Sequence, residues 1–301
     1  GSEAQDLPAY VVMPDPSGHP VDGVRNWSNG WLPPLFQGTV VRSRQPRILN
    51  LQPPKHLVGE LQQKNLTFLA ALNRRHLERH RGEADLEARI ASYELAGHMQ
   101  MTVPDAANLK AEPPHIRKLY GADSSNKDKV AFAENCILAR RLIERGVRFV
   151  QVTHSDSKVQ WDQHGKLRQG HAEKAAEVDK PIAGLLYDLK ARGLLEDTLV
   201  VWSGEFGRTP TVQGSGMDGR DHNPWGFTMW FAGAGVKGGF SYGATDDYGF
   251  YAERGKMHIH DVHATLLYLL GIDHERLTFY HNGIKRRLTD VHGHVVKHIL
   301  V

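Results

Sequence analysis

The spacing of hydrophobic positions over residues 113–301 alternates between a helical and an extended period. The extended runs are short, and the run at 198–202 is almost purely apolar, as expected of a strand covered by helices on both faces. Each helical run ends directly before a glycine, a residue that commonly terminates helices. The pattern predicts strands at 147–153, 198–202 and 227–232, and helices at 127–145, 171–192 and 261–270. This order indicates an α/β fold whose mostly parallel central sheet is covered by helices.

The N-terminal part of the chain follows a different pattern. It is rich in Pro and Gly, with short strands expected at 9–13 and 39–41. Residues 56–100 then show a helical period that Gly82 interrupts, which predicts a helical hairpin. We expect residues 1–301 to form a single α/β hydrolase-like domain, with the hairpin at 56–100 as a subregion within it.

The composition and net charge of the chain bear on whether it binds nucleic acid or a membrane. With 301 residues, 40% of them hydrophobic and 24% charged, the chain has the composition of a globular protein. Its net charge of +3 predicts no nucleic-acid partner. No apolar run approaches the ~20 residues of a membrane helix, so no membrane partner is expected. No signal peptide follows the Gly1-Ser2 start, so the sequence by itself leaves the localisation unknown. The single cysteine, Cys136, is expected to be a buried, unreactive thiol.

Four side chains with metal-binding chemistry lie in segments that adjoin predicted strands. Asp162 and His164 are two residues apart in a loop. Glu205 lies in the segment that directly follows the apolar strand, and His222 lies just before the next one. Because functional groups gather beyond the carboxyl ends of parallel strands, we expect these four side chains to meet around a common divalent cation. Their mixed oxygen and nitrogen donors favour zinc first and manganese second.

Three further residues are candidates for catalysis beside these ligands. Arg208 can form a bidentate pair with an anionic substrate, and Asp221 and His154 can act as general base or acid. A structural interpretation stands beside the catalytic one. In it, Asp162 caps the helix that follows its loop, and Glu205 forms an ion pair with Arg208.

Histidine is unusually frequent in this chain. There are 18 histidines, and they concentrate after residue 150. His258 and His260 precede a predicted helix, where Asp261 is expected to be an N-cap or first-turn acid. The segment 290–294 has the sequence Asp-Val-His-Gly-His, whose spacing suits metal binding, although a surface or packing role is an equal alternative.

Several motifs resemble those of a known bacterial family. The motifs that carry the resemblance are 194–210, 219–222, 231–239, 245–246 and 288–294. Together they resemble the sulfatase-like family labelled domain of unknown function 1501, of the alkaline phosphatase/sulfatase superfamily. The likeness runs along nearly the whole chain, although typical members are longer at the N-terminus. The resemblance implies an N-terminally truncated alkaline phosphatase-like core, whose missing part would hold the first core strand, an acidic metal ligand and the nucleophile.

The same resemblance implies roles for individual residues. It places ligands at Asp162, His164, Glu205 and His222, with Arg208 and Asp221 as near neighbours. The superfamily hydrolyses phosphate and sulfate esters with one or two divalent metals, and the resemblance implies a periplasmic or exported protein. One departure is that many members carry an Asp-His pair after the strand that here ends in Ser203-Gly204-Glu205.

The expected function is metal-dependent hydrolysis of a small anionic ester by a metal-activated water, with phosphate esters favoured over sulfate esters. One alternative is a catalytically silent metal- or anion-binding remnant of such an enzyme. Another is a metal-free serine hydrolase, against which Ser215 lacks the strand–turn–helix context of a nucleophile elbow. The glycine-rich segment 214–219 around it is typical of a mobile loop or lid. If a core strand is missing, the exposed sheet edge favours a homodimer.

Overall fold

The computed structural model describes residues 1–301 apart from 1–5, 50, 53, 58, 156–160 and 214–217. The described chain divides into two compact units. The first unit comprises Gly1–Gln160 with Ala175–Leu185, and the second comprises Trp161–Lys174 with Leu186–Val301. The expectation of a single domain over the whole chain stays a prediction, and each unit is described by itself.

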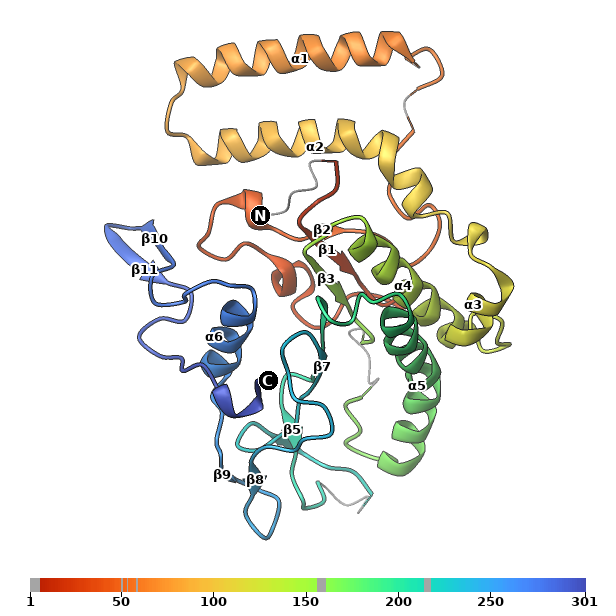
Figure 1. Cartoon of the computed structure of the whole chain (residues 1–301), viewed down its shortest axis with the longest axis vertical. Helices are drawn as coiled ribbons and strands as arrows, with labels where there is room; N and C mark the ends of the chain where they lie inside the picture. Colours follow the sequence, from red (N-terminus) through yellow and green to blue (C-terminus); the bar gives the residue numbers. More distant parts are fainter. Residues whose placement is uncertain (1–5, 50, 53, 58, 156–160, 214–217) are drawn as a thin grey trace. The chain divides into compact units, whose positions relative to one another are not determined.

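The first unit contains a three-stranded parallel sheet in the order β2-β1-β3 (Figure 1). Its strands are β1 (Tyr10–Met13), β2 (Thr39–Val40) and β3 (Phe149–Val152). The central strand β1 is the most protected, because Val11, Val12 and Met13 are fully buried. All three strands lie where the sequence predicts them. The parallel order agrees with the long connections between them, since parallel neighbours require crossovers rather than tight turns.

Two long helices occupy the region of the predicted hairpin (Figure 1). Helix α1 spans Glu60–Arg79 and helix α2 spans Ala84–Ala106. Gly82 lies between them with φ +89°, a left-handed conformation that glycine adopts without strain. Across the pair, the Gln62 side-chain amide donates to Gln100 Oε1 at 3.0 Å. The interruption that Gly82 predicts is therefore the turn of the hairpin.

Helix α4 (Lys127–Glu144) contributes a long run of buried residues to this unit. It begins at Asn126, whose side chain accepts hydrogen bonds from two backbone N–H groups of the first turn. The short helix α3 (Pro114–Tyr120) and the 3₁₀ turns at 23–27, 34–36 and 109–111 complete the unit. Tyr120 and Ile137 are almost completely buried.

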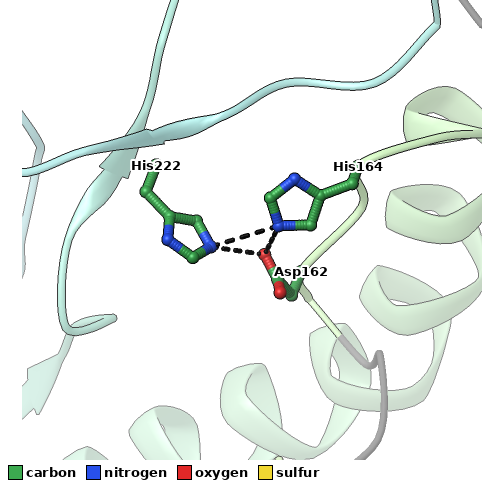
Figure 2. A group of neighbouring side chains, drawn as sticks. All are labelled: Asp162, His164 and His222. Carbon is green, nitrogen blue, oxygen red and sulfur yellow. Dashed lines mark hydrogen bonds and ion pairs between the residues drawn. The ribbon is translucent and has the colours of Figure 1, made fainter. Parts of the chain in front are cut away.

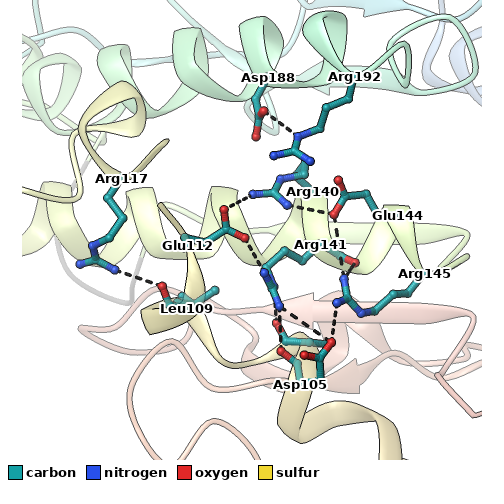
Figure 3. A network of polar contacts seen from close by, with 11 residues as sticks. Asp105, Leu109, Glu112, Arg117, Arg140, Arg141, Glu144, Arg145, Asp188 and Arg192 are labelled. Carbon is teal, nitrogen blue, oxygen red and sulfur yellow. Dashed lines mark hydrogen bonds and ion pairs between the residues drawn. The ribbon is translucent and has the colours of Figure 1, made fainter. Parts of the chain in front are cut away.

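Helix α4 also carries a buried network of charged side chains (Figure 3). Glu112 accepts hydrogen bonds from Arg140 Nη2 at 2.7 Å and from Arg141 Nη1 at 2.5 Å. The Glu112 and Arg140 side chains are only 3% and 2% exposed. Arg140 Nη1 also bonds Glu144 at 2.9 Å. A buried carboxylate held by two guanidinium groups is a strong constraint on how α4 packs, because either charge alone would be poorly solvated there.

The second unit is built from antiparallel pairs. Strand β4 (Leu199–Trp202) pairs antiparallel with β7 (Trp230–Gly233), and β5 (Gly207–Arg208) pairs antiparallel with β6 (His222–Asn223). The remaining pairs are β8 (Ala244–Thr245) with β9 (Ala252–Arg254), and β10 (Thr278–His281) with β11 (Ile284–Arg287). The described part of 203–229 contains no helix that could cross over, so β7 returns in the opposite direction to β4. The expected mostly parallel sheet is thus found only in β1–β3, and the chain is a mixed α/β protein.

Two more helices complete the description. Helix α5 spans Leu167–Ala191 and contributes residues to both units, whereas α6 (Ile259–Leu269) belongs to the second. The N-cap of α6 is His258, and Asp261 closes a capping box with it. A last 3₁₀ turn spans 297–299. Among the helices of the described residues, none is both long and apolar enough to cross a membrane.

Candidate metal centre

Three of the four predicted ligands meet in the second unit (Figure 2). The candidate ligand atoms of Asp162, His164 and His222 all lie within 4.8 Å of one another. Asp162 Oδ1 is 2.9 Å from Nε2 of both imidazoles, and the two Nε2 atoms are 3.2 Å apart. Around a tetrahedral zinc ion with bonds of ~2.0–2.1 Å, donor atoms are about 3.3 Å apart. The donor set and its spacing therefore fit a divalent cation.

Backbone contacts between two loops bring the three side chains together. Leu167 N donates to Asp218 O at 2.9 Å, and Arg220 N donates to Gln163 O at 3.2 Å. Between these bonds, Gly219 lies so close to the backbone of His164 that a β carbon at position 219 would overlap its carbonyl. Only glycine allows this approach. His222 then follows on β6, within reach of the Asp162 loop.

Arg208 supplies a positive charge at the same carboxylate. It lies on β5 directly opposite His222, and its Nη1 is 2.5 Å from Asp162 Oδ1. Its Nη2 also donates to Trp161 O at 3.4 Å. Burial alone would raise the pKa of Asp162, but hydrogen bonds from His222 and Arg208 outweigh it and hold the pKa below its usual value. The carboxylate is therefore ionised at neutral pH.

Two residues that the sequence did not single out orient the imidazoles. The Phe206 ring lies 4.2 Å from the ring of His222, centroid to centroid. Gln213 Oε1 contacts Nδ1 of His164, and Nε2 on the other side of the same ring lies 2.9 Å from Asp162 Oδ1. Phe206 stands inside a motif of the sequence analysis, whereas no sequence signal marks Gln213.

The other predicted site residues have different positions. Glu205 is exposed in the turn after β4 and is not part of the ligand group found among the described residues. Asp221 Oδ1 accepts a hydrogen bond from the backbone N–H of His222 at 2.7 Å, so it fixes the start of β6. His154 belongs to the first unit, where its Nε2 is 3.0 Å from the buried carboxylate of Glu177. The proposed lid residues 214–217, Ser215 included, lie outside the described residues.

These features define a mixed α/β protein with a candidate Asp-His-His metal centre beside an arginine. The family model described as protein of unknown function (DUF1501) matches residues 1–300, and the chain belongs to this family. The resemblance read from the sequence motifs is thereby confirmed at the level of the family. No curated protein and no solved structure matches the chain.

Proposed function

We propose that this protein is a metal-dependent hydrolase of phosphate esters, with sulfate esters as the second substrate class, and that it has the chemistry of the alkaline phosphatase/sulfatase superfamily that its motifs resemble. The observation that carries the proposal is the convergence of Asp162, His164 and His222 beside Arg208. When bound, a divalent cation, zinc first and manganese second, would polarise the ester and acidify a coordinated water.

The number and exposure of the protein ligands favour catalysis over a purely structural metal. Structural zinc sites are usually closed by four protein ligands, whereas catalytic sites have three and leave a position open. Here three side chains converge, and they are 38–44% exposed. A substrate from solvent can therefore reach the ligand atoms. Glu205 is exposed in the turn next to the site motif. If it bound as the fourth ligand that the sequence predicts, a water could join only as a fifth ligand, so the three-ligand group is the one on which the catalytic proposal rests.

The chain's own residues supply the remaining functions. Arg208 is positioned to offset negative charge on the non-bridging oxygens of the ester, a task that a planar guanidinium performs with two parallel hydrogen bonds. Gln213 and Phe206 hold the two imidazoles in place, and Asp221 holds the backbone of His222. His154, which contacts Glu177 within the first unit, stays our candidate for proton transfer from the sequence alone.

The test combines metal analysis with turnover. Protein purified without added metal is analysed by mass spectrometry and assayed with aryl phosphate mono-, di- and triesters and aryl sulfates. His164→Ala and His222→Ala should lose both the cation of the Asp162 group and hydrolysis, whereas Arg208→Ala should retain that cation and lose most of its kcat/KM. His115→Ala, an exposed histidine of the first unit, is the matched control and should behave as the parent. Full turnover in metal-stripped protein would refute the proposal. A stoichiometric metal with no hydrolysis would favour the silent binding remnant.

A further inference from the structure

A second group of histidines lies in the second unit, at the N-terminus of α6. It consists of His258, the N-cap of α6, His260 in the first turn, and His292 from the C-terminal segment; we call it the α6 histidine cluster. The ring centroids are 5.0 Å apart for His258 and His260, 5.5 Å for His260 and His292, and 6.3 Å for His258 and His292. None of these residues belongs to the Asp162 group.

The backbone that carries the α6 histidine cluster is held without any ligand. Both carboxylate oxygens of Asp261 are engaged: Oδ2 accepts from the N–H of His258 at 2.7 Å, and Oδ1 accepts from the N–H of His294 at 2.8 Å. Val296 N also donates to Thr265 Oγ1 at 3.0 Å. The C-terminal segment is therefore fixed to the first turns of α6. Asp261 has the structural role that its position in the sequence suggested. His258 Nδ1 accepts from the N–H of His260 at 3.3 Å, so Nε2 of His258 and the rings of His260 and His292 remain as the groups that could bind a ligand.

The spacing of the rings suits a shared cation. With metal–nitrogen bonds of ~2.0–2.1 Å, the ring centres of three imidazoles on one tetrahedral ion lie about 5 Å apart. The planes of His258 and His260 differ by 25°, those of His260 and His292 by 27°, and those of His258 and His292 by 51°. Turning a ring about its Cβ–Cγ bond is a soft, broad torsion, and it redirects the nitrogens while leaving the ring centre almost in place. The side chains can thus converge without movement of the backbone, although a turn of the His258 ring gives up the hydrogen bond that its Nδ1 accepts from the N–H of His260.

One atom of this cluster lacks a partner. Nδ1 of His260 is buried and has no hydrogen-bond partner among the described residues. A buried polar atom without a partner is costly, and a ligand that reaches it would remove that cost.

We propose that the α6 histidine cluster binds a second divalent transition-metal cation, on ligands distinct from Asp162, His164 and His222. Three nitrogen donors without a carboxylate favour zinc, copper or nickel over magnesium or calcium. The inference does not depend on the proposed hydrolase activity. It explains why His260 and His292 gather beside His258, of which the helix cap uses only Nδ1.

The experiment counts cations. Full-length protein treated with a chelator is titrated with Co²⁺, whose visible absorption reports imidazole coordination, and zinc is then counted by mass spectrometry after gel filtration. The parent should bind two cations per chain. His260→Ala and His292→Gln should each bind one, with affinity for the second weakened more than tenfold, and His164→Ala should retain the cation at α6. His115→Ala should be unchanged. Since His292 is exposed, His292→Gln decides the matter if His260→Ala fails to fold.

The outcomes separate this inference from the proposed function. Unchanged stoichiometry and affinity in both α6 variants would overturn it, as would a parent protein that binds no cation dependent on His260 or His292. If only the cation at α6 is found, the inference stands and the metal-dependent hydrolase proposal fails. If only the cation at the Asp162 group is found, the reverse holds, and the stacked rings are a packing feature.

Discussion

Replacing Glu112 by Gln tests whether the buried charge network holds the first unit together. The substitution keeps the shape of the side chain but removes the charge that faces Arg140 at 2.7 Å and Arg141 at 2.5 Å. Hydrogen bonds to charged groups contribute about 1.5–3 kcal/mol each, and leaving a buried charge without its partner costs about 3–5 kcal/mol. We expect a loss of about 3–5 kcal/mol in the free energy of unfolding. At about 2–4 °C per kcal/mol for a unit of this size, the Tm should fall by roughly 10 °C.

The assay is urea unfolding followed by circular dichroism as a function of pH. Burial alone would raise the pKa of Glu112, but hydrogen bonds from Arg140 and Arg141 outweigh it and lower the pKa below its usual value of 4.5. A carboxyl with a lowered folded-state pKa contributes stability that is complete above 4.5 and is lost as the pH falls through the folded-state pKa. The gap between the parent and Glu112→Gln should therefore be constant near neutrality and shrink only below pH 4.5.

An isosteric control separates burial from charge. Glu60→Gln removes the same charge from a pair with Lys64 at 3.3 Å, but that Glu side chain is 90% exposed. Exposed pairs contribute little, so this variant should have the stability of the parent. If Glu112→Gln lost no more than Glu60→Gln, or if its loss were independent of pH below 4.5, the network would not carry the stability assigned to it.

Three other substitutions or measurements follow from single contacts. Gly219→Ala should push the two site loops apart and weaken metal binding more than tenfold with unchanged far-UV circular dichroism; parental affinity would contradict the close approach to His164. Burial raises the pKa of the Cys136 thiol far above its ordinary value, so a thiol reagent should modify it only after unfolding, and rapid labelling of native protein would contradict this. Burial also raises the pKa of Tyr10 to about 12, so an absorbance titration should show a late-ionising tyrosine that is absent in Tyr10→Phe. Stability from Tyr10 should be complete below pH 10 and decline above it, because the unfolded side chain ionises first.

Local patterns predicted the helices well. The predicted helix at 127–145 is α4 (Lys127–Glu144), and that at 261–270 is α6 (Ile259–Leu269). Periodicity and the glycines that follow these helices are local signals, so one sequence suffices to read them. Strand direction is not local. The apolar run of β4 looks the same in a parallel or an antiparallel pair, so the sequence alone does not reveal that β7 pairs with it in the antiparallel direction.

In the candidate site, too, some features follow from local sequence and others depend on how distant segments of the chain meet. Asp162 and His164 are neighbours in one loop, and His222 reaches them because Gly219 lets a second loop touch the first. Glu205 satisfied the same chemical criteria, yet the turn after β4 leaves it exposed and outside the ligand group. The sequence shows which side chains could bind a metal, but the direction of each side chain depends on turns that no periodicity describes. Gln213 could be found only from the structure.

The sharing of Asp162 Oδ1 between Arg208 and the two imidazoles has a thermodynamic consequence. A divalent cation at this oxygen would compete with the guanidinium for the same lone pairs and would displace Arg208 from its ion pair. The displaced arginine would then be available to an incoming anion. Metal and anion would therefore bind with positive cooperativity, each raising the affinity of the other by the same factor. Arg208 would thus pair with the Asp162 carboxylate in the metal-free protein and with the bound anion in the metal-bound protein.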